Sequence, residues 1–110
     1  MNVNELLIST LSSHGPVIPD SYEGEEEKYI TFNYPDETAI LFGDNKPKKI
    51  AVYVQVHLYL PMQDEYQEEK MQICRELLNA GFKWPDVTIL TEKEVGKRHI
   101  VFETKIRNHI

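Results

Sequence analysis

Within residues 48–61, KKIAVYVQVHLYLP, the positions from Ile50 to Leu60 alternate between two kinds of side chain. This period of two predicts one long β-strand with one face committed to a core. The core set consists of Ile50, Val52, Val54, Val56, Leu58 and Leu60. The other set includes Tyr53, Gln55, His57 and Tyr59, which are too apolar for an ordinary solvent-exposed face and too polar for a second core. This second face therefore needs an explanation of its own.

Three more predicted elements precede this strand. Residues 2–14 predict a short helix, in which Asn2 and Glu5 have the spacing of a capping box and Gly15-Pro16 ends the helix. Residues 29–35, YITFNYP, alternate as a strand, and PDET at 35–38 predicts a turn. A short strand over 39–42 then follows, and Gly43-Asp44-Asn45 ends it.

After the long strand, Asp64 and Gln67 form a second capping-box candidate at the start of a helix that Gly81 ends. VTILTE and RHIVFETKI are the last two predicted strands, joined by KEVGK in a hairpin. The whole order predicts an α+β fold over residues 1–110. It would be a single domain with a mainly antiparallel sheet of about four to five strands and two helices packed on one face. The helices would cover the Ile50 to Leu60 row.

Charge and apolar content exclude several classes of protein. The chain has 18 acidic against 12 basic residues and a formal net charge of −6, whereas nucleic-acid binders concentrate Lys and Arg against phosphates. No apolar run approaches the length of a membrane span, and the first residues lack the pattern of a signal peptide. We therefore expect that the protein does not bind nucleic acid and has no membrane partner.

Catalytic and metal-binding patterns are also missing from the sequence. Cys74, the single cysteine, lies inside the second predicted helix beside Ile73, which favours core packing over a reactive thiol. The four histidines lack the sequence spacing of a metal motif, although His57 and His99 on neighbouring strands leave open a site assembled in space. No glycine-rich phosphate loop is present. The sequence predicts no enzyme, no cofactor and no metal.

The order of these features resembles one known group of proteins. A leading helix is followed by HGPVIPDSYEGEEEKYITFNYPDE, a lysine-rich loop, YVQVHLYLP, a helix ending ELLNAGF, and TILTEKEVGKRHIVFETKI. This order is similar to that of the tail terminator and minor tail proteins of long non-contractile-tailed bacteriophages and their prophages. The similarity extends from Leu6 to about Ile106 and is carried by apolar and turn patterns.

The resemblance implies a structural protein of the virion tail, made in the bacterial host cytoplasm. Such proteins assemble as a ring, usually of six subunits, on the major tail tube protein; the ring stops tube polymerisation and meets the head–tail connector protein. A ring of identical subunits needs two different contact faces on each copy. Tyr53, Gln55, His57 and Tyr59 are candidates for one contact, because tyrosine is enriched at interfaces. Covering of these residues by the chain's own first helix or a neighbouring strand is the competing interpretation.

Two charged segments also gain expected roles from this resemblance. Lys46, Lys48 and Lys49 could contact acids of the next subunit, with residues 20–27 and 44–49 becoming ordered on assembly. Glu23, Glu25, Glu26 and Glu27 are candidates for the lining of the ring's lumen, because negative charge there would repel DNA that only passes through. Equally, these glutamates could simply keep a loop solvated.

Two alternatives stay open at this level. The first is a head–tail joining or tail completion protein of the same assembly, since folds and interface chemistry overlap between these roles. The second is a small ligand-binding or enzymatic α+β domain, which predicts a concave pocket with convergent polar groups.

Overall fold

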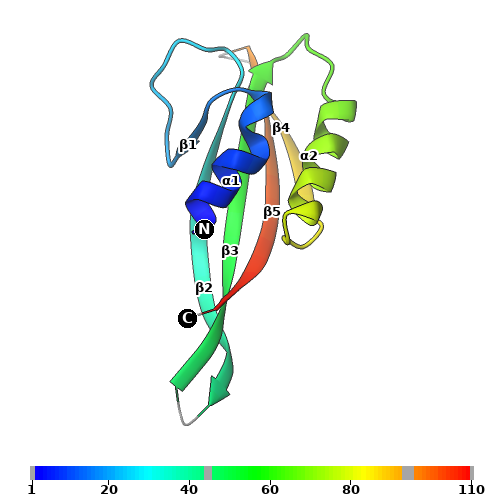
Figure 1. Cartoon of the computed structure of the whole chain (residues 1–110). Helices are drawn as coiled ribbons and strands as arrows, with labels where there is room; N and C mark the ends of the chain where they lie inside the picture. Colours follow the sequence, from blue (N-terminus) through cyan, green and yellow to red (C-terminus); the bar gives the residue numbers. More distant parts are fainter. Residues whose placement is uncertain (1, 44–45, 93–95, 110) are drawn as a thin grey trace.

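The chain is described by a computed structural model that covers residues 2–43, 46–92 and 96–109. Helix α1 (Val3–Leu11) continues into a 3-10 turn, η1 (Ser12–His14), and is followed by strands β1 (Val17–Pro19), β2 (Tyr29–Gly43) and β3 (Lys46–Pro61). Helix α2 (Gln67–Asn79) precedes strands β4 (Asp86–Glu92) and β5 (Lys97–His109). Figure 1 shows both helices in front of one sheet. The predicted α+β class is confirmed.

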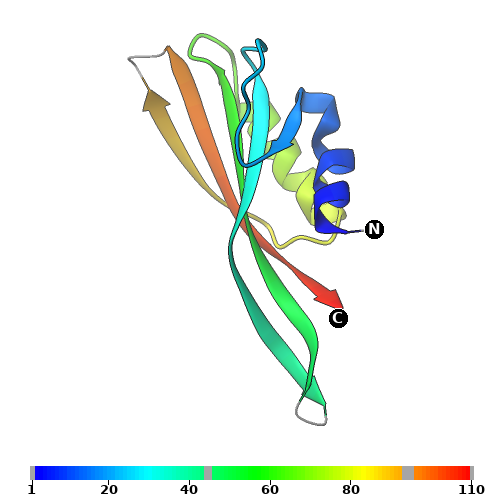
Figure 2. The same cartoon turned by 90° about the vertical axis from the view of Figure 1, so that its left-hand side faces the viewer.

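The five strands form one mixed sheet in the order β1-β2-β3-β5-β4. Only the β1–β2 pair is parallel, while β2–β3, β3–β5 and β4–β5 are antiparallel. The molecule measures 54 × 26 × 22 Å, and Figure 2 shows that its length follows the β2–β3 hairpin, which continues past the helices. The sheet is therefore covered by helices over only part of its length.

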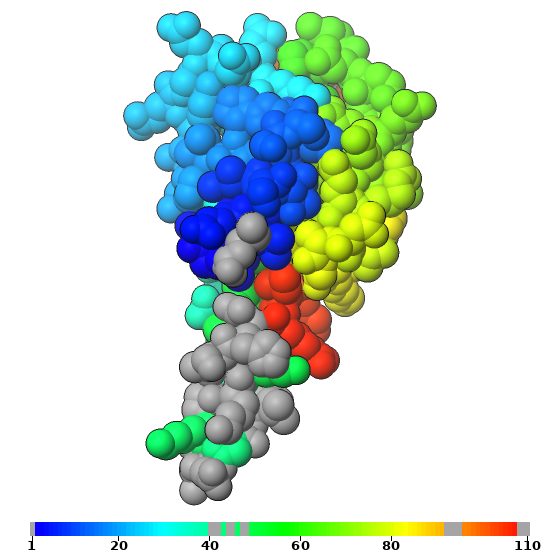
Figure 3. Space-filling view, viewed as in Figure 1, coloured from blue at the N-terminus to red at the C-terminus, as the bar shows by residue number. Residues whose placement is uncertain are grey.

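The core lies between the helices and one sheet face, as the long strand's apolar row predicts. Val52, Val54, Val56, Leu58 and Leu60 are all buried, whereas Ile50 is only partly buried at the hairpin end of the row. Residues from both helices cover them: Leu7, Leu11, Ile73, Cys74 and Leu77. Figure 3 shows α1 and α2 side by side on this face. The register predicted for the long strand is thus confirmed.

Local signals explain most helix ends. Asn2 Oδ1 accepts a hydrogen bond from the Glu5 N–H at 2.8 Å, as an N-cap side chain should. At the end of α2, the N–H groups of Gly81 and Phe82 donate to the carbonyls of Leu78 and Leu77, and Gly81 has φ 106°. This is the paired bonding of a Schellman motif. At the start of α2 the prediction is wrong, because Glu65 Oε1, not Asp64, accepts from the Gln67 N–H.

The hairpin differs from the prediction in two ways. Residues 35–38 are not a turn, because β2 runs unbroken from Tyr29 to Gly43. The pairing register shifts between Asn33 and Asp36, so the extra residue forms a bulge that keeps Pro35 within a strand. Lys46 to Lys49 are not a loop either, because β3 begins at Lys46. The short parallel strand β1 was not predicted.

A buried histidine joins the two helical segments. His14, 6% exposed, lies with Nδ1 2.8 Å from Glu69 Oε2 and Nε2 2.5 Å from Glu76 Oε1. Lys28 forms an ion pair with Glu69 on the same side. The imidazole therefore bridges η1 to two carboxylates that lie seven positions, or about two turns, apart on α2.

Candidate functional site

The sheet face opposite the helices, here named the open face, carries the second set of residues from the long strand (Figure 2). The pairing register defines its members as Tyr29, Thr31 and Asn33 of β2, Tyr53, Gln55, His57 and Tyr59 of β3, His99, Val101, Glu103 and Lys105 of β5, and Asp86, Thr88 and Leu90 of β4. The four residues predicted from β3 are all half-buried. Helix α1 lies on the other face, so it does not cover them.

Four rings at one end of the open face stack across the strands in an aromatic row: Tyr22, Tyr29, Tyr59 and His99. Successive ring centroids lie 4.6, 4.9 and 4.2 Å apart, with interplanar angles of 33°, 21° and 18°. Such cross-strand aromatic pairs each contribute about 0.5–1.5 kcal/mol beyond area burial. The half-buried state of these residues therefore comes from mutual stacking.

A hydrogen-bond chain runs beside the aromatic row. His57 Nε2 lies 2.8 Å from Asn33 Oδ1, and because an amide oxygen only accepts, His57 donates there. In the neutral ring Nδ1 then accepts, and it lies 2.8 Å from Nε2 of His99, which donates. Asn33 Nδ2 in turn donates to Gln55 Oε1 at 3.1 Å. The chain of donors runs from His99 through His57 and Asn33 to Gln55.

This arrangement disfavours a charge on His57. Burial, and next the nearby His99, lower the pKa of His57 below its ordinary value. A proton added at His57 Nδ1 would also face the N–H of His99 at hydrogen-bond distance. We therefore expect the His57 ring to be neutral at neutral pH.

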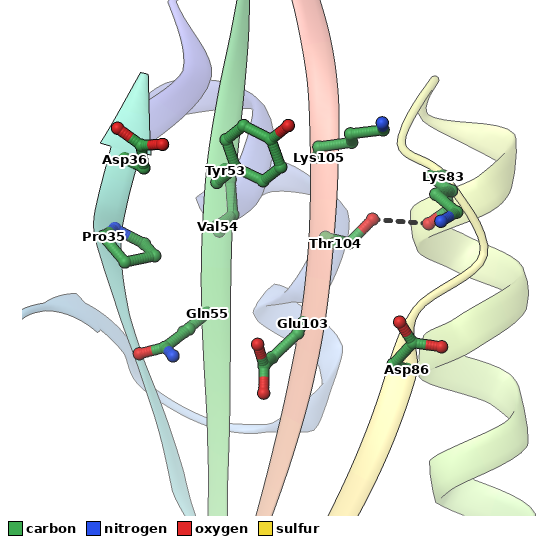
Figure 4. A pocket seen from close by; sticks show the side chains of 10 residues that line it. All are labelled: Pro35, Asp36, Tyr53, Val54, Gln55, Lys83, Asp86, Glu103, Thr104 and Lys105. Carbon is green, nitrogen blue, oxygen red and sulfur yellow. Dashed lines mark hydrogen bonds between the residues drawn. The ribbon is translucent and has the colours of Figure 1, made fainter. Parts of the chain in front are cut away.

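The other end of the open face is hollowed. A depression of about 280 Å³ lies between Tyr53 and Gln55 of β3 and Glu103 of β5. Figure 4 shows the acids Asp36, Glu103 and Asp86 around it, together with Lys83 and Lys105. Lys105 Nζ also lies 5.8 Å from the centroid of the Tyr53 ring. Thr104 donates to the carbonyl of Lys83 at 2.5 Å, which fixes the α2–β4 connection at the rim.

The charged residues predicted for the subunit contact and for the lumen lie near the start of β3 and in the β1–β2 connection. Lys46 is exposed at the start of β3 and Lys49 is half-buried in the same strand. The Lys48 side chain lies outside the described part of the chain. Glu23, Glu25, Glu26 and Glu27 are all exposed in the β1–β2 connection, where the Glu26 N–H donates to the Tyr22 hydroxyl. The two charged groups are separated along the molecule.

Cys74 is buried in the core and its pKa is raised, chiefly by burial. Within the described residues, no group of three or more His, Cys, Asp or Glu side chains could hold a metal ion. In the same residues, no helix is both long and apolar enough to cross a membrane.

Sequence reasoning missed the partners that complete the site. Asn33, Tyr29 and Tyr22 were not singled out, although Tyr29 and Asn33 alternate in the same pattern as the long strand. The hollow was missed too, because Asp36, Asp86 and Lys83 come together only through strand order. The signal that could have found the first set was the antiparallel register of β2 against β3.

Comparison with known proteins gives no family assignment: no protein-family model matches the chain, and no curated protein matches it.

Proposed function

We propose that this protein is a structural subunit of a bacteriophage or prophage tail. In this role it forms a ring at the head-proximal end of the tail tube, stops tube polymerisation and joins the tube to the head connector. The proposal rests on the sequence resemblance, and the observation that supports it best is the open face. Helices cover one sheet face, while the other presents stacked tyrosine and histidine rings with polar neighbours.

The chemistry of the open face suits contact with another protein. Tyrosine brings a large apolar area and a polar tip, and it is enriched at interfaces. The rings of the aromatic row hold one another in place, so little side-chain freedom is left to lose on binding. The open face therefore supports docking of a tube, connector or neighbouring subunit.

The hollow fits an interface better than a ligand site. Its volume of about 280 Å³ is slightly below the roughly 300–1,000 Å³ typical of small-molecule pockets. Its rim carries both acids and bases, such as Glu103 and Lys105, instead of a convergent set of one kind. This arrangement suits the polar rim of a protein contact.

The exposed glutamates of the β1–β2 connection are proposed to line the ring's lumen. Glu23, Glu25, Glu26 and Glu27 are all solvent-exposed, so several copies would present a ring of negative charge. Such a surface repels a passing duplex because both carry the same charge.

The test combines purified chain with tail tubes assembled from the tube protein of the same phage. Negative-stain electron microscopy should show a ring at one tube end, and addition of the chain during assembly should shorten the tubes. An inert chain, with unchanged tube lengths and bare ends, would contradict the proposal. A ring that binds finished tubes without stopping their growth would point to the head–tail joining role instead.

A further inference from the structure

Among the described residues, five of the seven exposed large apolar side chains lie along one lateral side of the molecule. Here named the β4–α2 side, it is formed by the outer strand β4, the α2–β4 connection and the outer flank of α2. Its apolar members are each between 37% and 49% exposed: Met71, Leu78, Trp84, Ile89 and Leu90. Single exposed apolar residues are ordinary, but a group along one side marks an interaction surface.

Helix geometry places the α2 members on the outer flank. Glu69 and Glu76 face His14, which lies on the α1 side of the helix. Met71 and Leu78 each follow one of these glutamates by two positions, or about 200° around the helix. They therefore point away from α1, toward the side of the molecule on which β4 lies (Figure 1).

Strand β4 is itself an unprotected edge. It ends the sheet order, and its central residues, Val87–Thr91, contain neither proline nor lysine. Natural edge strands commonly carry such residues to prevent pairing with another chain. Ile89 and Leu90 are exposed on opposite faces of this strand, so it can be approached from either face.

The opposite lateral side, here named the β2–α1 side, differs in chemistry. Of the described residues, it carries the exposed apolar side chains of Ile8 and Tyr34, and the Tyr34 hydroxyl donates to Asn4. Beyond Phe32 no described strand pairs with the outer edge of β2, because β1 pairs only with Ile30 to Phe32. This edge is therefore open as well.

The two sides also complement each other in charge. On the β2–α1 side, the exposed Glu37 lines the same depression as Tyr34 and Asn4. Burial, and next the charges of Glu37 and Asp20, raise the pKa of Tyr34. On the β4–α2 side, the exposed bases Arg75 and Lys83 form no ion pair with another described residue. Bases that lack an internal partner on one side can thus meet acids on the other.

We propose that the β4–α2 side of one copy packs on the β2–α1 side of the next copy, with β4 alongside β2. This inference deepens the proposed function, on which it rests, by naming the contact within the ring. Because the two sides are different surfaces, the contact is head to tail and repeats from copy to copy instead of stopping at a dimer, and it forms a ring where the rotation between copies closes. The open face is then left available for the tube or the connector.

Cysteine crosslinking tests the pairing directly in the full chain. Cys74→Ala supplies a background without thiols, and Thr91→Cys and Glu37→Cys place one exposed thiol on each side. With a short bismaleimide at high protein concentration, the double-cysteine chain should form a ladder of dimers, trimers and larger species. A mixture of the two single-cysteine chains, one carrying a size tag, should form only dimers of unlike partners.

Two controls make the test specific. Thr91→Cys combined with Ser13→Cys, an exposed position in η1, should give no ladder. Ile89→Lys in the double-cysteine chain should reduce the ladder at least fivefold while leaving the far-UV circular dichroism unchanged, because a charge then protects the edge. Homodimers of Thr91→Cys alone, or a ladder as strong with the Ser13 thiol, would overturn the inference.

Failure of the inference can be told apart from failure of the proposed function. Rings seen on tubes, without the expected crosslink in those rings, would leave the function standing and place the subunit contact elsewhere. A crosslinked ladder from a chain that never binds tubes would support the contact and contradict the tail function.

Discussion

His57 and His99 lie on adjacent strands with Nδ1 of the first 2.8 Å from Nε2 of the second, although 42 positions separate them in the chain. His57 is bonded through its other nitrogen to Asn33, so both of its nitrogens are engaged. The ring is thereby fixed in one orientation on the open face. Its protonation is consequently coupled to folding.

The first prediction concerns stability against pH. The pKa of His57 is lowered in the folded state, chiefly by burial, whereas the unfolded chain has the ordinary value of about 6.5. Above pH 6.5, His57 is neutral in both states and its contribution to the free energy of unfolding is fully present. Below pH 6.5 the unfolded state binds more protons at this site, so this contribution is lost as pH falls toward the folded pKa. Urea unfolding from pH 8 to 5 should show this loss, and His57→Gln should weaken it. An identical pH slope in wild type and variant would contradict the assignment.

The second prediction concerns the core register. Val54 is 1% exposed beneath the helices, so Val54→Asp should prevent folding because the buried carboxylate has no partner. Thr88→Asp places the same side chain on the exposed open face of β4 and should still fold. Thermal melts followed by circular dichroism compare the two. A cooperatively melting Val54→Asp chain would show that the core differs from the one described.

The third prediction concerns Cys74. Cys74→Ala should cost about 1 kcal/mol or less, through loss of a small buried side chain, and leave ring formation intact. Because burial raises the pKa of the thiol, a thiol reagent at pH 7.5 should react with it rapidly only when urea unfolds the chain. Loss of assembly in a folded Cys74→Ala chain would instead give the thiol a functional role.

The fourth prediction concerns the contact between η1 and α2. His14→Ala removes the bridge to Glu69 and Glu76 and should lower the free energy of unfolding by about 1–3 kcal/mol, because both partly buried carboxylates lose the imidazole and Glu69 keeps its ion pair with Lys28. Ser13→Ala, at an exposed neighbouring position, should change it by no more than about 0.5 kcal/mol. Equal effects of the two substitutions in urea titrations would show that the bridge contributes little.

The fifth prediction concerns the basic start of β3. Lys48→Glu with Lys49→Glu should leave the melting temperature nearly unchanged, because Lys49 is only half-buried near the start of β3 and is not part of the buried core. If these lysines meet acids of the next subunit, the double variant should no longer limit tube length. Tube lengths from electron micrographs measure the effect. Termination at normal length by the double variant would show that these lysines are not the contact.

The sequence alone predicts those features that depend on neighbours in the chain. The alternation from Ile50 to Leu60 assigns strand, core face and open face together, because side-chain direction in a strand is set by position. Asn2 and Gly81 end their helices through bonds to residues a few positions away. The burial of Cys74 follows from its place on the apolar arc of α2.

The sequence misleads where tertiary pairing overrides a local preference. PDET at 35–38 is a turn signal, yet pairing with β3 holds these residues in a bulged strand, because the ladder beyond them supplies bonds that an isolated turn lacks. Pairing likewise extends β3 back to Lys46, where composition indicated a loop. In both places a partner strand decided the conformation.

What the sequence by itself determined is the α+β class, the buried row of β3 and the presence of a second, half-polar face. Only the tertiary structure decided what that face contains. The order β2-β3-β5-β4 brings Asn33, His57 and His99 into hydrogen-bond contact and gathers the exposed apolar residues of α2 and β4 on one side. Periodicity reports the direction of a side chain from its own strand, whereas the identity of its neighbour depends on strand order and register. These are set by packing over the whole chain.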